Sequence, residues 1–266
     1  MFDSSGRTTF VFSLGSDFLA SAISSFLVIC LNEEKKRVLL VDLSSKLILS
    51  KLLSKKDSRK DWLSIIGKQG SVTDFISSTD FSYLDILASD EIEYSYCEKR
   101  LPELFKKLVG GVSGEKLFRE KLEGESLKKF YKHILIVSPS DERHVFVEGI
   151  VSSDEILIVA EINYELLLAK ASSIIGIINL IKSRYVPDFG ILKIIPAFKE
   201  SERIGEFAEN QLSELRKIFG GKVSDFVFRY VESEEWLKSK LFDKSGKAVK
   251  SLDSSIKKLA REVFQD

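Results

Sequence analysis

The sequence predicts a single doubly wound α/β domain, and three observations support that prediction. Short apolar runs rich in β-branched residues alternate with longer segments whose apolar residues recur at helical spacing. The first segments follow the order strand, helix, strand, which is the unit that builds parallel sheets. No low-complexity stretch divides the 266 residues. We therefore expect one domain over residues 1–266, with a mainly parallel sheet and helices on both faces.

The first strand–helix–strand unit is the clearest one. Thr9–Ser13 is a short β-rich run, and the dipeptide Gly15-Ser16 forms a turn after it. Phe18–Asn32 then carries apolar residues at helical spacing, with Ser16 or Asp17 as the expected N-cap. Val38–Val41 is a continuous apolar run, which is typical of a strand buried on both faces. We expect this second strand to lie near the centre of the sheet, beside the first.

The same alternation continues to the C-terminus. Further strands are expected at Tyr83–Leu87, His133–Val137, Ile156–Ala160, Gly190–Ile195 and Phe226–Tyr230. Further helices are expected at Leu101–Val109, Glu115–Phe130, Tyr164–Ser183, Glu202–Phe219 and Ser254–Phe264. In sheets of this kind, ligands bind beyond the carboxyl ends of the strands. The turns that follow the strands are therefore where a functional site is expected.

Composition excludes several classes of function. The chain has 40 basic and 40 acidic residues and no formal net charge, which argues against a polybasic binder of nucleic acids. Cys30 and Cys97 lie too far apart for a CxxC zinc site, and the two histidines form no HExxH motif. No apolar stretch reaches the ~20 residues that span a bilayer, and the start does not have the pattern of a signal peptide. We expect a soluble, cytoplasmic protein without a metal site.

Two segments connect these elements to a known family. Residues 36–43 have the sequence KRVLLVDL, and residues 130–140 have the sequence FYKHILIVSPS. They resemble the KRVLLIDLD and YDYIIIDTPP segments of the ParA/MinD family of deviant Walker ATPases, and the resemblance covers nearly the whole chain. It implies a P-loop NTPase fold of the SIMIBI, ParA/MinD-like type. It also implies a dimer, because active members of the family hold two ATP molecules between two subunits.

The phosphate loop of that family is degenerate here. Counting back from Asp42 by the family's spacing aligns residues 15–22 with the loop KGGVGKTT. Such a loop needs glycines, so that backbone N–H groups wrap the phosphates, as well as a lysine for charge and a hydroxyl for magnesium. Ser21 keeps the hydroxyl. The degenerate positions are Gly15, Ser16, Asp17, Phe18, Leu19 and Ala20. Gly15 and Ala20 replace the two lysines, and Asp17 adds a negative charge where phosphate would bind.

The other nucleotide motifs of the family change in the same direction. Val137 replaces the aspartate at the end of the YDYIIIDTPP-like strand, and Ser44 replaces the second aspartate of the DLD switch. Asp42 is retained, either as a contact to magnesium-bound water or as a cap of the turn that follows it, and we favour the cap. Ser21 and Asp42 are thus the two remnants of a cofactor site. The resemblance implies ATP and magnesium as cofactors, but these substitutions argue against both.

The C-terminal segment 238–261 is rich in basic residues. They are Lys238, Lys240, Lys244, Lys247, Lys250, Lys257, Lys258 and Arg261, against two acids. ParA-like proteins bind nonspecific DNA through basic residues in this region, so the resemblance implies a patch that contacts DNA phosphates or a partner. The alternative is a solvated helix face, which is the usual role of a charge run. MinD relatives carry a membrane-targeting helix beyond this segment, and here we expect no membrane anchor.

Two functions follow from these observations. The first is a noncatalytic ParA/MinD-like protein that acts as a scaffold or positioning factor through protein partners, as a homodimer that needs no nucleotide. If Phe18 and Leu19 are exposed, they give that dimer an apolar centre; alternatively, they fold inward and fill the vacated pocket. The second function is an ATP-binding partition or cell-positioning ATPase with a distorted phosphate loop.

Overall fold

The computed structural model describes residues 6–44, 46–54, 71–87, 117–124, 126–138, 149–184, 186–243, 249 and 252–264. The strands are β1 (Arg7–Leu14), β2 (Val38–Asp42), β3 (Ile76–Ser78), β4 (Leu84–Leu87), β5 (His133–Val137), β6 (Glu155–Glu161), β7 (Gly190–Lys199) and β8 (Phe228–Tyr230). The α-helices are α1 (Asp17–Glu33), α2 (Ile48–Leu53), α5 (Leu117–Gly124), α6 (Leu127–Phe130), α8 (Leu167–Arg184), α9 (Glu206–Phe219), α10 (Glu234–Leu241) and α11 (Ser254–Phe264).

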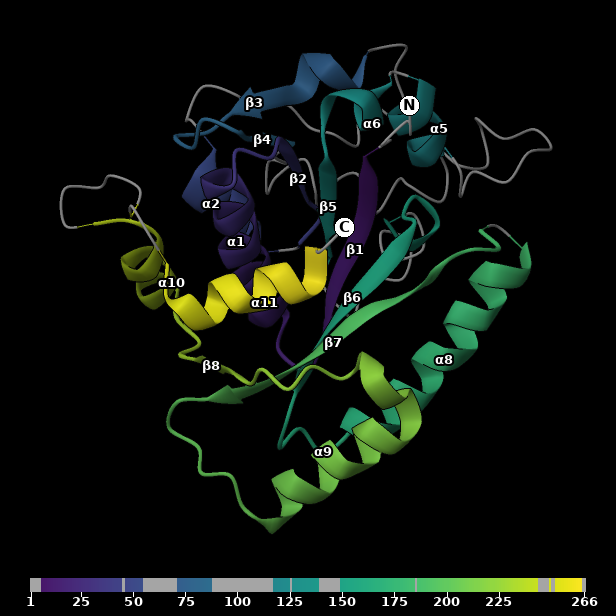
Figure 1. Cartoon of the computed structure of the whole chain (residues 1–266), viewed down its shortest axis with the longest axis vertical. Helices are drawn as coiled ribbons and strands as arrows, with labels where there is room; N and C mark the ends of the chain where they lie inside the picture. The colour runs from purple at the N-terminus through teal and green to yellow at the C-terminus, as the bar shows by residue number, and fades with distance from the viewer. Residues whose placement is uncertain are drawn as a thin grey trace.

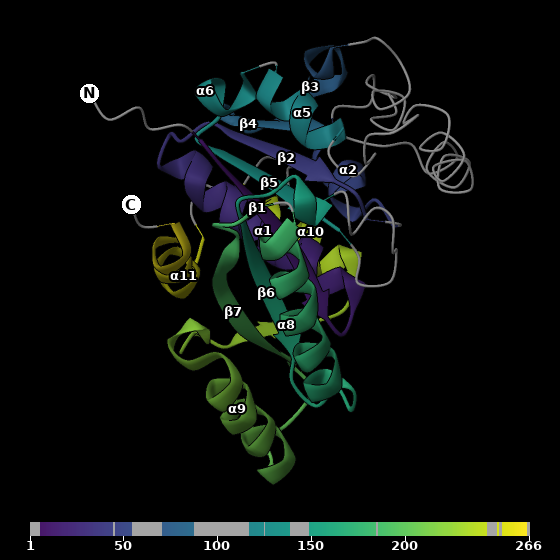
Figure 2. The ribbon, with the colours of Figure 1, turned by 90° about the vertical axis from the view of Figure 1, so that its right-hand side faces the viewer.

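The strands form one eight-stranded sheet in the order β3-β4-β2-β5-β1-β6-β7-β8. Every pairing between these strands is parallel except that of β3 with β4. Helices cover both faces of the sheet, as Figures 1 and 2 show from two directions. The predicted doubly wound, mainly parallel α/β fold is therefore confirmed.

The prediction that β2 lies beside β1 is wrong. β5 lies between them and pairs with β1 on one side and with β2 on the other. All five residues of β5 are buried, as expected for a central parallel strand. Val137, the last residue of β5, is thereby paired with Val11 of β1 and with Asp42 of β2. The two positions where the ParA/MinD family carries strand-end aspartates are neighbours in the sheet, but only one of them is acidic here.

Each face of the sheet has its own hydrophobic core. On one face, α1, α2, α10 and α11 pack against the sheet, and on the other face α5, α6, α8 and α9 do so. Every residue from Phe18 to Leu31 in α1 is buried, which is expected for a helix that is apolar on all sides. Within the described ranges, no helix has both the length and the hydropathy that a membrane span requires.

Several boundaries and three short elements differ from the sequence prediction. The helix expected over 115–130 is two helices in the described residues, separated near Ser126, whose φ is +57°. The elements α2, β3 and α10 were not predicted, because runs of three to eight residues are too short to show a period. For α10, the N-cap Ser233 was a signal that could have been used. The helix predicted at 101–109 lies outside the described residues.

Candidate functional site

The turn between β1 and α1 is where a phosphate loop would lie. β1 ends at Leu14 and α1 begins at Asp17, so Gly15 and Ser16 alone connect them. A loop of the GxxxxGK type needs several more residues between strand and helix, so that its N–H groups can point at the phosphates. Here residues 17–20 form the first turn of α1 instead. Two residues thus connect strand and helix where a loop of that type has more.

Carboxylates of the protein itself lie at the N-terminus of α1. Glu161, the last residue of β6, accepts a hydrogen bond from the Ser16 N–H at 2.7 Å, and Glu232 accepts one from the Ser16 hydroxyl. The same hydroxyl oxygen caps the helix by accepting from the Phe18 N–H at 3.3 Å. Helix N-termini attract anions because their first N–H groups lack partners within the helix. In this protein two glutamates supply the negative charge that a phosphate would otherwise bring.

Glu161 is held by two further groups. The Tyr230 hydroxyl donates to it at 2.6 Å, and the Lys199 ammonium lies 3.7 Å from Glu161 and 3.1 Å from Glu232. Burial and the hydrogen bond to Glu161 raise the pKa of Tyr230, so its hydroxyl stays protonated and donates. The hydrogen bonds from Ser16 and Lys199 lower the pKa of Glu232, which keeps it charged. Both carboxylates at the turn are therefore held by groups of the protein itself.

Phe18 and Leu19 do not provide an apolar centre for a dimer, so the suggestion that they are exposed is wrong. Their exposed fractions are 3% and 0%, because the first turn of α1 points them into the core. The Phe18 ring stacks on Tyr230 with 6.2 Å between centroids. Ala20 is 1% exposed, and Asp17 lies in the first helical turn, where an acid is favourable. The alternative interpretation, in which both side chains fold inward, agrees with the structure.

Asp42 is fully buried and its carboxylate is satisfied within the chain. One oxygen accepts from the Ser44 N–H (3.1 Å) and hydroxyl (2.6 Å), and the other accepts from the Ser50 N–H (2.7 Å) and hydroxyl (2.8 Å). Burial raises the pKa of Asp42, and these four hydrogen bonds oppose that rise. Asp42 thus joins the end of β2 to the start of α2, which is the geometry of a turn cap.

The Ser21 hydroxyl makes no hydrogen bond with Asp42. Ser21 lies in the second turn of α1 with an exposed fraction of 0%, and its hydroxyl has no hydrogen-bond partner among the described residues. Val137, also fully buried, places an apolar side chain beside Asp42 in the sheet. In the part of the chain that the structure describes, no three His, Cys, Asp or Glu side chains are arranged to hold a metal ion.

The C-terminal basic residues do not form one continuous described patch. Three of them, Lys244, Lys247 and Lys250, lie outside the described residues. Four others are exposed, namely Lys238 and Lys240 on α10 and Lys258 and Arg261 on α11. Lys257 forms an ion pair with Glu33 at 2.8 Å, and Arg261 lies 4.0 Å from Glu34. The Lys257 pair links α11 to the C-terminal end of α1, so part of the basic charge is neutralised.

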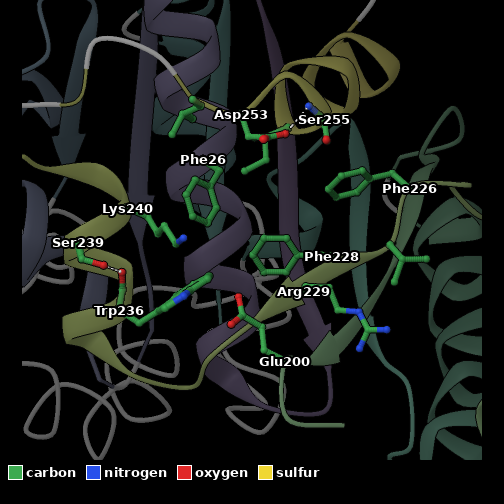
Figure 3. A pocket seen from close by; sticks show the side chains of 13 residues that line it. Phe26, Glu200, Phe226, Phe228, Arg229, Trp236, Ser239, Lys240, Asp253 and Ser255 are labelled. Carbon is green, nitrogen blue, oxygen red and sulfur yellow. Dashed lines mark hydrogen bonds between the residues drawn. The ribbon is translucent and has the colours of Figure 1, made fainter. Parts of the chain in front are cut away.

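A cavity that the sequence did not predict opens between α1, β8, α10 and α11 (Figure 3). Its volume is about 500 Å³. Aromatic side chains make up much of its lining, with Phe26 from α1 and Phe226, Phe228 and Trp236 from the C-terminal third of the chain. The aromatic residues close together at 226–236 were a usable signal, but nothing in the sequence places Phe26 beside them.

Comparisons with known proteins agree with this fold. Residues 20–191 match the family model for the AAA domain, AAA_31. The match begins inside α1, so it leaves out β1 and the turn at Gly15-Ser16. No curated protein matches the chain by sequence.

Solved structures resemble the chain over most of its length. McdA from Cyanothece, solved with ATP, has a TM-score of 0.74 at 18% identity, over 97% of this chain and 96% of that one. A ParA family ATPase from Chlorobium tepidum TLS has a TM-score of 0.64 at 21% identity, over 97% and 98%. A plasmid partition protein from Borrelia burgdorferi has a TM-score of 0.62 at 13% identity, over 88% and 94%. These likenesses show a ParA/MinD-like P-loop NTPase fold.

Proposed function

This chain belongs to the AAA domain family, and from that premise we propose that it is a noncatalytic ParA/MinD-like protein, which acts as a scaffold or positioning factor through protein partners. The observation that carries the proposal is the two-residue turn between β1 and α1, occupied by Glu161 and Glu232. Phosphoryl transfer depends on cations placed around the transferred group. The positions aligned with the family's lysines hold Gly15 and Ala20.

A second candidate is an ATP-binding partition or positioning ATPase, as the alignment alone also allowed. The fold favours it, because McdA was solved with ATP and the Chlorobium protein is a ParA family ATPase. For this candidate to hold, the first turn of α1 would have to unwind into a loop. Glu161 and Glu232 would also have to leave the helix N-terminus. Both changes break hydrogen bonds that the folded chain makes.

Magnesium-ATP is expected not to bind, and phosphate release is expected to stay at the level of a blank without protein. The variant Ala20→Lys should behave the same way, because residue 20 is buried in α1 and no loop is present to place its ammonium beside a phosphate. Isothermal titration calorimetry and a phosphate-release assay measure the two quantities. Magnesium-dependent binding tighter than ~1 mM, about 4 kcal/mol, would favour the ATPase over the scaffold.

Self-association is expected to be independent of nucleotide. Light scattering after gel filtration should give twice the chain mass of 30.1 kDa, with or without ATP. With Phe18 and Leu19 buried, the interface must use other apolar surface, and the described residues expose Leu180 on α8 and Phe207 on α9. Phe207→Asp should weaken the dimer if the start of α9 forms its interface. A monomer under both conditions, or a dimer that forms only with ATP, would contradict the expectation.

Nonspecific DNA is a less favoured partner in this proposal. Lys257 and Arg261 already face Glu33 and Glu34 at the end of α1, and the chain has no net charge to attract a polyanion. A protein partner requires no such charge, so it agrees better with these observations.

A further inference from the structure

The cavity between α10 and α11 has a floor made of aromatic rings. Phe26, Phe228 and Trp236 contact one another edge to face, with centroids 5.7, 6.1 and 6.4 Å apart. Phe226 lines the cavity from another side (Figure 3). Aromatic pairs at these separations attract one another beyond the area that they bury. The floor is therefore set by the fold, and its volume of about 500 Å³ lies within the range of natural ligand pockets.

Only part of this floor is sealed inside the protein. Phe26 and Phe228 have exposed fractions of 2% and 3%, whereas Trp236 is half-buried. Trp236 lies in the first turn of α10. The hydroxyl of the N-cap residue Ser233 accepts a hydrogen bond from the backbone N–H of Trp236 at 3.2 Å. The indole of Trp236, held by its ring contacts with Phe26 and Phe228, is thus an apolar surface that a second molecule can reach.

Two of the four charged residues that line the cavity are committed elsewhere. Arg229 donates to the backbone carbonyl of Glu202 at 3.1 Å and stacks over the Phe198 ring. Asp253 accepts from the Ser255 N–H at 2.7 Å near the start of α11. Both side chains therefore serve the fold.

The other two, Glu200 and Lys240, remain available. Both are exposed, and Figure 3 shows them on either side of Trp236. The Lys240 ammonium lies 5.8 Å from the centroid of the Trp236 ring. Among the described residues, the Glu200 side chain makes no hydrogen bond or ion pair. One free acceptor and one free donor thus lie at the opening of an aromatic cavity.

We propose that this cavity binds an extended segment of a partner protein through one aromatic side chain of that segment. This inference rests on the proposed function, since it names the surface by which the scaffold holds a partner. The side chain packs on the aromatic floor, as buried aromatic residues do at the centres of interfaces. A peptide backbone presents an N–H donor and a C=O acceptor at each residue. Glu200 accepts from that N–H, and Lys240 donates to that carbonyl.

Other occupants match the lining less well. A partner's lysine or arginine, drawn to the rings, would meet the ammonium of Lys240, which already lies over Trp236. A nucleic acid could stack on the rings, but the lining has two acids, Glu200 and Asp253, against two cations, Arg229 and Lys240, so it offers no net positive charge to phosphates. An uncharged backbone with an aromatic side chain avoids both conflicts.

The experiment compares blocked nine-residue peptides that carry tryptophan, phenylalanine or alanine at the centre of identical Gly/Ser flanks. Binding to the full chain is measured by ligand-observed NMR titration. The tryptophan peptide is expected to bind at least ~10-fold more tightly than the alanine peptide, which is the typical loss when a central interface aromatic is truncated. Equal affinities for these two peptides would overturn the proposal.

Two matched variants locate the binding. Ser239→Trp places an indole at the cavity's edge and should weaken the tryptophan peptide at least ~10-fold. Ser183→Trp on α8 is the control, because Ser183 is also exposed and also donates to the carbonyl three residues earlier. Unchanged affinity in Ser239→Trp, or equal loss in both variants, would overturn the location.

Two further comparisons test the polar contacts and the class of ligand. Glu200→Met and Lys240→Met should each weaken the tryptophan peptide about 3- to 10-fold, the size of one lost hydrogen bond, without changing the thermal melt. N-acetyl-tryptophanamide should bind more weakly than the peptide; equal affinity would mean a site for small aromatic molecules and would overturn the peptide assignment. The ATP titration does not involve this cavity, so a negative peptide result leaves the noncatalytic proposal standing.

Discussion

Replacing Gly15 with alanine is expected to lower the free energy of unfolding by about 3–5 kcal/mol, from backbone strain and lost hydrogen bonds. Gly15 has φ = +139°, a backbone conformation that side chains other than glycine rarely adopt. A Cβ built at this residue would lie 2.3 Å from Oε2 and 2.4 Å from Cβ of Glu161. The second contact is with the base of that side chain, so a rotation of its end does not relieve the overlap.

The size of this effect comes from the contacts that Glu161 makes. To clear the new methyl group, Glu161 must move away from the Ser16 N–H and the Tyr230 hydroxyl, at 2.7 and 2.6 Å. A hydrogen bond to a charged group contributes about 1.5–3 kcal/mol, and strained backbone costs about 1–3 kcal/mol. Even if one of the two bonds reforms, the sum remains large for a single methyl group.

Urea unfolding followed by circular dichroism measures this change. Gly176→Ala is the control, because Gly176 lies in α8 with no atom within 4 Å of a built Cβ, and alanine there should stabilise by about 0.5–1 kcal/mol. In the double variant Gly15→Ala/Glu161→Gly, both overlapping atoms of residue 161 are gone, so the two single losses should add to more than the loss measured. If Gly15→Ala unfolds at the wild-type urea concentration, the close approach of Glu161 to the turn is wrong.

The sequence was most informative where apolar patterns were long and continuous. β5 and α11 occur at the predicted residues, and α1 extends the predicted helix by one residue at each end. These elements are decided by local burial, which leaves its period in the sequence. The order of strands is not local: the insertion of β5 between β1 and β2 joins segments about a hundred residues apart, and no period records it.

The same distinction between local and long-range features explains which parts of the candidate site could be predicted from the sequence. The shortness of the turn was readable, because Ser16 and Asp17 are typical first residues of a helix and leave two residues after β1. The alignment with the family's phosphate loop assigns these same residues to a loop, which conflicts with the short turn that the helix signals predict. Glu161 and Glu232 were not readable, since they lie 145 and 216 residues from Ser16 in the chain. Only the fold brings their carboxylates to the helix N-terminus.

Replacing Asp42 with alanine is expected to lower the free energy of unfolding by about 3–5 kcal/mol, because buried donors lose their acceptor. The N–H and hydroxyl groups of Ser44 and Ser50 all donate to this carboxylate, and its exposed fraction is 0%. The hydroxyls can turn to other acceptors, but the two backbone N–H groups cannot. For a chain of this size, the loss corresponds to a fall in Tm of about 10 °C.

Asp42→Asn and Ser21→Ala complete the test of Asp42. Asparagine keeps one acceptor oxygen and turns an NH₂ group toward the donors of either Ser44 or Ser50, so we expect a loss of about 2 kcal/mol, smaller than that of alanine. Ser21→Ala removes a buried hydroxyl without a hydrogen-bond partner and should change stability by no more than about 0.5 kcal/mol. Differential scanning calorimetry without nucleotide measures all three. If Asp42→Ala has the same Tm as the wild type, the Asp42 carboxylate does not hold the turn, and the magnesium interpretation of Asp42 regains support.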